Sequence, residues 1–182
     1  MTLERIPAGQ VWQEHDHRLR YHLARGLIGR NDAVLDAACG VGYGTYILSG
    51  SSGNVFVGVD KEPADLEYVE LAERVRYVTA DLNGPNRDIV LEGVGEFDVS
   101  VSFETIEHLD DPEDFVGWLC RHTTRTIVAS VPVVPSKHWN EYHLHDFDRD
   151  DLPAMFATHG WQLRASLDQP SESSVIYVFG LF

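Results

Sequence analysis

Apolar side chains recur along the chain in blocks whose spacing switches between that of a helix and that of a strand. Residues 11–28 carry them at helical intervals and end before Gly29, which predicts an amphipathic helix. Five shorter apolar blocks have the length and composition of buried strands. They are Ala33–Ala37, Val55–Val59, Val75–Thr79, Phe97–Phe103 and Thr126–Val131.

The segments between these strands favour helices, and the chain closes on two further strands. Helices are predicted at 43–50, from about Pro63, at 112–122 and at 148–159, with one helical turn at 88–91. The last two strands, 161–167 and 175–182, are joined by a connection too short for a helical crossover. We therefore expect an α/β fold in one domain over residues 1–182, with a doubly wound, mostly parallel, Rossmann-like sheet of seven strands that ends in an antiparallel hairpin.

The composition is that of a globular protein in a reducing compartment. Of the 182 residues 43% are apolar, and no apolar run approaches the roughly 18 residues that cross a bilayer. Met1–Gln10 lacks a basic segment followed by an apolar stretch, so no signal peptide is expected. The two cysteines, Cys39 and Cys120, form neither a disulfide framework nor a metal-binding spacing. These features predict a cytoplasmic protein with no membrane span.

The charge balance is strongly acidic. The chain has 14 Lys and Arg against 29 Asp and Glu, for a net charge of −15. Such a surface repels phosphate backbones, which bind proteins through Lys and Arg. Nucleic acid is therefore a disfavoured substrate, although a local basic groove or a partner could override this.

Polar residues follow the predicted strands at the edge where an open α/β sheet binds its ligands. A glycine-rich loop with Gly40, Gly42 and Gly44 follows Asp36, and Asp60 ends the second strand. Glycines let the backbone turn sharply and approach a ligand closely. Asp60 stands 20 residues after Gly40, a spacing suited to binding ribose hydroxyls.

Two details of this loop separate it from a nicotinamide site. The spacing is Gly-x-Gly-x-Gly, without the third glycine position of the dinucleotide fingerprint. Asp36 also brings negative charge to the loop, which suits a sulfonium and an ammonium and repels a pyrophosphate. A nicotinamide-dependent oxidoreductase is the rival enzyme that these details disfavour.

Four segments occur at the strand ends in a fixed order: Val34–Thr45, Val57–Asp60, Thr79–Leu82 and Phe103–Leu109. They resemble the successive motifs of class I S-adenosylmethionine-dependent methyltransferases of the small type 11 and type 23 kind. The resemblance implies S-adenosylmethionine as cofactor, with its methionine portion on the glycine loop, its ribose on Asp60 and its adenine against Asp81 and Leu82. Phe103 and Glu104 would flank the methyl-transfer site.

The implied cofactor-binding residues share a position just after one of the first four strands. They are Asp36, Ala37, Cys39, Gly40, Gly42, Tyr43, Gly44, Asp60, Lys61, Asp81, Leu82 and Phe103. Ala37, Ala38 and Cys39 could equally be small packing residues.

The long connection after the fifth strand, Ser130–Phe147, is rich in aromatic residues and histidines, as functional loops are. In enzymes that resemble this chain, an Asn-x-x-His pattern here faces the methyl acceptor. We therefore expect His143 to be a general base or acceptor ligand, with Asn140 and Tyr142 beside it, and we assign catalysis to His143 and Glu104. The alternative is that His143 only bonds the loop to the core.

The helix over about residues 11–28 is expected to cover the cofactor site. Its segment 14–18 with Tyr21 resembles the leading segment of methyltransferases of bacterial surface-glycan assembly. His15, Arg18 and Tyr21 share one helical face by their spacing and are assigned to the acceptor side. The remaining polar residues of the segment, Glu14, Asp16 and His17, are expected to be solvated.

Glu104, Glu107 and His108 could form a metal site, with His143 or His145 as the fourth ligand. Methyltransferases that act on the 3′ ends of small RNAs bind a divalent ion with a similar set. The Glu-x-x-Glu-His-Leu pattern is also common in class I enzymes that use no metal, and the acidic composition disfavours RNA. We expect no metal, and a metal-dependent RNA 2′-O-methyltransferase stays an alternative.

These patterns predict in-line methyl transfer from S-adenosylmethionine to an oxygen or nitrogen of a small molecule or sugar-type glycan. A base is needed only for a hydroxyl or a protonated amine. A fold alone does not imply activity, so a non-catalytic partner subunit with the methyltransferase fold is the alternative from another class. A partner subunit or homo-oligomer could complete the acceptor pocket.

Overall fold

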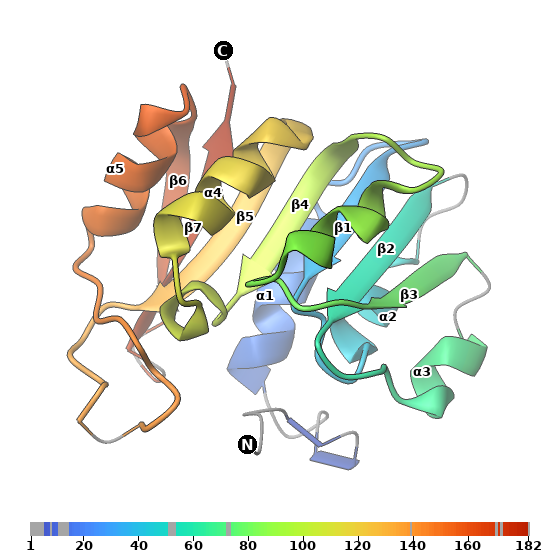
Figure 1. Ribbon diagram of the computed structural model, residues 1–182, viewed down its shortest axis with the longest axis horizontal. Coiled ribbons are helices and arrows are strands. Elements are labelled where there is room, and N and C mark those ends of the chain that lie inside the picture. The colour runs from blue at the N-terminus through green and yellow to red at the C-terminus, as the bar shows by residue number, and fades with distance from the viewer. Residues whose placement is uncertain are drawn as a thin grey trace.

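The computed structural model describes residues 6–7, 9–10, 15–50, 54–71, 74–138, 140–169, 171 and 173–181. Seven strands in these residues form one sheet (Figure 1). The strands are β1 Ala33–Ala37, β2 Val55–Asp60, β3 Val75–Thr79, β4 Phe97–Phe103, β5 Thr123–Pro132, β6 Gln162–Gln169 and β7 Ser174–Gly180. Their order across the sheet is β3-β2-β1-β4-β5-β7-β6.

The sheet changes from parallel to antiparallel at β5. The neighbours from β3 to β5 pair in parallel, with Leu35 opposite Val57 and Phe103 opposite Ser130. β7 pairs antiparallel with both β5 and β6. These pairings confirm the predicted fold class. The connection between the last two strands is too short for a crossover, so the strands pair as a hairpin.

Helices cover both faces of the sheet (Figure 1). One face carries α1 His15–Arg25, α2 Tyr43–Leu48 and α3 Leu66–Leu71, and the other carries α4 Pro112–Arg121 and α5 Asp151–Thr158. Successive strand residues point to opposite faces, so Val34 packs with the α1 side while Leu35 packs with the α4 side. The two apolar clusters hold the strand ends in fixed positions.

Several predicted boundaries are corrected by local hydrogen bonds. Of the helix expected over 11–28, residues 15–25 form α1, the predicted end at 28 is three residues too late, and 11–14 lie outside the described residues. α3 begins three residues later than the expected Pro63, because the Asp65 carboxylate accepts the Glu67 N–H and starts the helix there. The expected turn at 88–91 is a longer 3₁₀ helix, η2, over Pro85–Leu91. Phe182, the predicted end of the last strand, lies outside the described residues.

Candidate cofactor and active site

The carboxyl ends of β1, β2 and β4 lie side by side, which places the predicted cofactor residues along one edge of the sheet. β1 lies between β2 and β4, with Asp36 opposite Gly58 on one side and Val101 on the other. Asp60 ends β2 and Phe103 ends β4. The convergence predicted from the strand order is therefore present.

The glycine loop after β1 is fastened to the end of β2. The Gly40 N–H donates to Asp60 Oδ2 at 2.8 Å, and the Cys39 N–H donates to the Val59 carbonyl at 2.8 Å. Gly40 has a φ of +58°, and no described atom lies within 4 Å of where its Cβ would stand. The Cβ position of Gly40 is therefore open space, beside a carboxylate.

Gly42 is required by close packing under the loop. Its φ is +96°, and a Cβ there would lie 2.8 Å from the Tyr77 ring. The Tyr77 hydroxyl donates to the Gly42 carbonyl at 2.9 Å. β3 therefore fixes the far side of the loop.

Asp36 is a buried carboxylate, 1% exposed, rather than an open one. Thr45 Oγ1 donates to its Oδ2 at 2.7 Å, and the Tyr21 hydroxyl donates to its Oδ1 at 3.4 Å. Burial raises the pKa of Asp36 to about 7, although these hydrogen bonds oppose the rise. Its negative charge therefore depends on pH near neutrality.

Helix α1 lies across the loop through aromatic side chains. Tyr21 is buried, with its ring centroid 5.0 Å from that of Phe103 and 5.5 Å from that of Tyr43. The His17 ring is hydrogen-bonded to the Tyr43 hydroxyl, so the expectation that His17 is solvated is wrong. Burial, aided by the Arg20 guanidinium, lowers the pKa of His17 to about 3, so this ring is neutral at pH 7.

The contact between α1 and α2 depends on the absence of a side chain at Gly44. A Cβ there would lie 2.0 Å from Tyr21 Cζ. Gly44→Ala is therefore expected to lower the free energy of unfolding by about 1–3 kcal/mol, despite the better helix propensity of alanine. Urea unfolding measures this. Tyr21→Leu, which removes the ring tip, should make the further Gly44→Ala substitution much less costly. Costs that simply add in the double variant would contradict the contact.

Glu104 is held by side chains from three different elements. Its Oε1 accepts from Ser130 Oγ at 2.7 Å and its Oε2 from Ser174 Oγ at 2.8 Å. Arg20 Nη1 lies 3.4 Å from Oε1, and this arginine is 0% exposed. Arg20 Nε also donates to Gln169 Oε1 at 2.6 Å. Since the backbone of Glu104 has a φ of +47°, the surroundings fix both its backbone and its carboxylate.

The predicted adenine residues lie after β3. Leu82 is buried, while Lys61 and Asp81 form an exposed ion pair with Nζ 3.3 Å from Oδ2. The other Asp81 oxygen accepts the Asn83 N–H at 3.0 Å. An apolar side chain and a positioned carboxylate thus lie next to each other on the β3 side of the glycine loop.

The long connection after β5 folds against the short 3₁₀ turn η3, Ile106–His108. His143 is 8% exposed, and its Nδ1 lies 2.5 Å from Ser136 Oγ. The Asn140 side chain accepts the Tyr142 N–H at 3.0 Å, and the Tyr142 carbonyl lies 2.9 Å from His108 Nδ1. Trp139 lies outside the described residues.

The three acceptor-side residues expected on α1 differ in burial. Tyr21 is buried under the loop, Arg18 is half-buried and His15 is exposed. The structure thus brings Tyr21 to the cofactor loop. Arg20, the residue before Tyr21, lies against Glu104.

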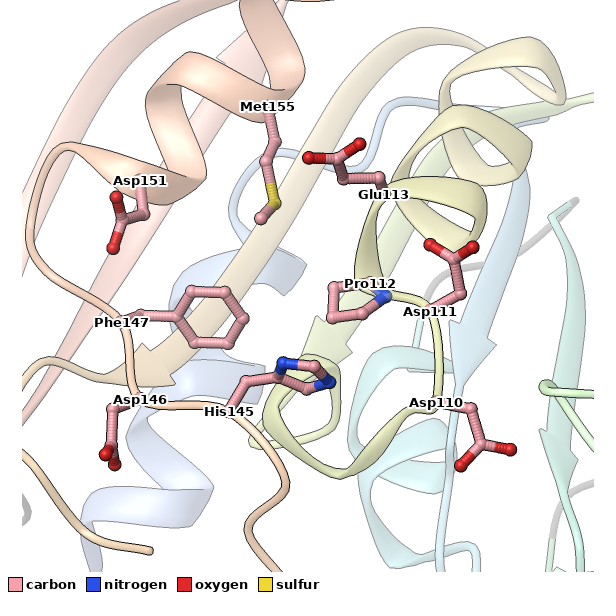
Figure 2. Close-up of a pocket in the computed structure, with 9 residues that line it drawn as sticks. All are labelled: Asp110, Asp111, Pro112, Glu113, His145, Asp146, Phe147, Asp151 and Met155. Carbon is pink, nitrogen blue, oxygen red and sulfur yellow. The ribbon is translucent and has the colours of Figure 1, made fainter.

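A separate hollow of about 410 Å³ lies between α4, α5 and the loop that precedes α5 (Figure 2). Pro112, Phe147 and Met155 line it together with several carboxylates, as Figure 2 shows. Its lining consists of Asp110, Asp111, Pro112, Glu113, His145, Asp146, Phe147, Asp151 and Met155. None of the predicted cofactor or acceptor residues belongs to this lining.

Residues 35–125, half of the chain, match a known protein family described as a methyltransferase domain. The chain belongs to this methyltransferase domain family. The matched region runs from β1 to the start of β5 and so includes every predicted cofactor-binding residue. Among the described residues, no helix is long and apolar enough to span a membrane.

The chain is similar to a curated relative and to many solved structures. A protein of Mycolicibacterium smegmatis described as a probable S-adenosylmethionine-dependent methyltransferase is 26% identical over 175 residues. The match covers 91% of this chain, which spans only 65% of the relative's length.

Two solved structures illustrate the shared fold. The 1,6-didemethyltoxoflavin-N1-methyltransferase of Burkholderia thailandensis, bound to 1,6-didemethyltoxoflavin and S-adenosylhomocysteine, is 19% identical with a TM-score of 0.71, covering 94% of this chain and 80% of that one. A second match is a structure of the Haloferax volcanii Trm112 methyltransferase activator in complex with a methyltransferase. It is 15% identical with a TM-score of 0.69, and the match covers 96% of this chain and 94% of that one. At these identities the likeness concerns the fold.

The methyltransferase motifs do not include the residues that hold Glu104 or its partner Arg20. Arg20, Gln169, Ser130 and Ser174 come from separate parts of the chain, and sequence reasoning missed them. Arg20 stands in a polar helical segment, where an arginine is usually solvated. No local pattern distinguishes it from Arg18 or Arg25.

Proposed function

We propose that this chain transfers the methyl group of S-adenosylmethionine to an oxygen or nitrogen of a small-molecule or sugar-type acceptor. One observation carries the cofactor assignment: the space at the Cβ position of Gly40 is open, and the Gly40 N–H donates to Asp60. Membership of the methyltransferase domain family supports the reaction. The structural neighbour bound to S-adenosylhomocysteine supports the cofactor class.

The cofactor is proposed to lie across the ends of β1, β2 and β3, with α1 over its methionine portion. Asp60 would bind the ribose, and Leu82 and Asp81 would contact the adenine. Asp36 and the glycine loop would hold the methionine portion, with Ala37, Cys39, Tyr43 and Lys61 around the cofactor. α1, whose Tyr21 packs on the loop, would cover this site within one domain over residues 1–182.

Methyl transfer is proposed to depend mainly on alignment. The sulfonium is already an activated leaving group, so the protein has to hold donor and acceptor in line and exclude water. Alignment of this kind supplies about 7–11 kcal/mol of a barrier. Phe103 and Glu104 would flank the transferred methyl group, and the ties to Arg20, Ser130 and Ser174 give Glu104 a fixed position.

A small or sugar-type acceptor is favoured over nucleic acid by the net charge of −15. The neighbour bound to 1,6-didemethyltoxoflavin shows that this fold accepts a small molecule elsewhere. His15, Arg18, Asn140 and Tyr142 are proposed to line the acceptor side. The role of His143 as base stays a prediction, because its Nδ1 is engaged by Ser136 in a buried position.

The cofactor assignment is tested by Asp60→Ala. The variant should bind S-adenosylhomocysteine at least about tenfold more weakly in calorimetry, because hydrogen bonds to a charged carboxylate contribute about 1.5–3 kcal/mol. Glu62→Ala, an exposed acid two residues further on, is the matched control and should leave the affinity unchanged. Unchanged affinity in Asp60→Ala would show that the ribose assignment is wrong.

Ligand choice separates the alternatives. A chain that binds NADH and does not bind S-adenosylmethionine would overturn the proposed function. Tight binding of S-adenosylhomocysteine, with no turnover of a panel of small amines, hydroxyl compounds and sugars, would instead favour a partner-dependent or non-catalytic role. The neighbour solved with an activator makes this outcome a concrete one to test, by adding candidate partner subunits.

A further inference from the structure

Glu107, His108 and His143 bring three potential metal ligands together where the loop after β5 meets η3. One ligand atom from each residue lies within 4.8 Å of the other two. Glu107 is 1% exposed, and its Oε1 lies 3.8 Å from His108 Nε2. We propose that these three side chains bind one transition-metal ion of the Zn²⁺ type, which fastens the loop to η3.

The histidine rings are oriented as metal-binding histidines are. Nδ1 of His108 lies 2.9 Å from the Tyr142 carbonyl, and Nδ1 of His143 lies 2.5 Å from Ser136 Oγ. A metal-bound histidine typically hydrogen-bonds through its other ring nitrogen, which fixes the tautomer and the ring plane. The metal is therefore assigned to Nε2 of both rings.

The donor set determines the kind of metal. Two imidazoles and one carboxylate suit Zn²⁺ and Co²⁺, whereas Mg²⁺ and Ca²⁺ prefer an all-oxygen shell. Ligand atoms of a tetrahedral Zn²⁺ lie about 3.3 Å apart, since each bond is about 2.0–2.1 Å long. The Glu107 Oε1–His108 Nε2 distance of 3.8 Å is near this value, and metal binding would require the three side chains, now within 4.8 Å of one another, to move closer together. A fourth position stays open for water or an acceptor atom.

The backbone already joins the same two segments. The N–H groups of Leu144 and His145 donate to the Glu107 carbonyl at 2.8 and 3.1 Å. His145 Nε2 lies 2.9 Å from the Leu109 carbonyl. A metal on the side chains would add a second fastening to this junction and so make the loop more rigid.

The proposed metal site differs from the one that the sequence pattern suggests, because it does not include Glu104. Glu104 belongs to the group formed with Arg20, Ser130 and Ser174, whereas Glu107 points to the two histidines. The inference thus replaces the expectation of no metal. It also removes His143 from proton transfer, because the metal would occupy Nε2 while Ser136 engages Nδ1.

The test titrates Co²⁺ and Zn²⁺ into the full chain after treatment with a chelator. One Co²⁺ per chain should bind with the intense visible absorption of a four-coordinate ion, and calorimetry should give one tight Zn²⁺ site. His143→Ala and Glu107→Gln should each lower the affinity more than tenfold, and Ser136→Ala about tenfold. His138→Ala is the matched control, since His138 is exposed in the same loop and lies outside the cluster, and this variant should bind the metal normally.

A ligand exchange keeps the test decisive if an alanine variant unfolds. His143→Cys should retain Co²⁺ and add a thiolate-to-cobalt absorption band. Absence of stoichiometric binding to the wild-type chain, an equal loss in His138→Ala, or a missing thiolate band would each overturn the proposal. Binding of S-adenosylhomocysteine is measured in the same samples, so failure of the metal site and failure of the proposed function are distinguishable.

Discussion

Replacing Arg20 by methionine is expected to lower the free energy of unfolding by about 3 kcal/mol. The arginine is 0% exposed and lies 3.4 Å from the Glu104 carboxylate, which is 20% exposed. Removing one partner of a buried ion pair costs about 3–5 kcal/mol, and the partial exposure of Glu104 places this case at the lower end. Methionine keeps the helix propensity and much of the volume, so the loss reports the charge and its hydrogen bond to Gln169.

Urea unfolding of two further variants identifies the cause. The double variant Arg20→Met/Glu104→Gln should recover part of the loss, because it leaves no unmatched carboxylate. Arg149→Met removes an exposed ion pair with Asp168 and should leave the stability unchanged within error. A loss in Arg20→Met no larger than that in Arg149→Met would mean that the buried pair does not stabilise the fold.

The meeting of the candidate cofactor residues at one edge of the sheet was predictable because its signals are local. Asp36, Gly40 and Asp60 occupy fixed places after apolar strands, and parallel strands bring their carboxyl ends to one edge. The short connection before β7 likewise fixed the hairpin. In each case a few neighbouring residues determine the geometry.

The surroundings of α1 and Glu104 were only partly predictable, because the side chains that meet there are far apart in the sequence. Arg20 meets Gln169 across 149 residues, and His17 meets Tyr43 across 26. Periodicity assigns a side chain to a face of its own helix, but it does not say what packs against that face. The pattern therefore predicts a solvated His17, and it gives no sign that Arg20 is buried.

The burial of Asp36 predicts a pH dependence that a solvated carboxylate would not give. Burial raises its pKa from 3.8 to about 7, so the folded chain keeps a proton that the unfolded chain releases between these values. The contribution of Asp36 to stability is therefore full below about pH 4 and is lost as the pH rises to 7. The groups facing it are Tyr21, Thr45 and Asp60.

Binding of a cationic ligand should run in the opposite direction. If the methionine portion of S-adenosylmethionine binds the ionised form of Asp36, its affinity should fall about tenfold for each pH unit below 7. Calorimetry between about pH 5.5 and 7 avoids the titration of the ligand's own amino group, whose pKa lies near 8.

Two controls isolate the carboxylate. Asp36→Asn cannot titrate, so its affinity for S-adenosylmethionine should stay nearly constant across this range. The neutral nucleoside 5′-methylthioadenosine lacks the ammonium and the sulfonium, so its binding to the wild-type chain should also be independent of pH. A slope that persists in Asp36→Asn would assign the proton to another group. A flat profile in the wild-type chain would mean that the cofactor does not bind through the charge of Asp36, even though the glycine loop holds it.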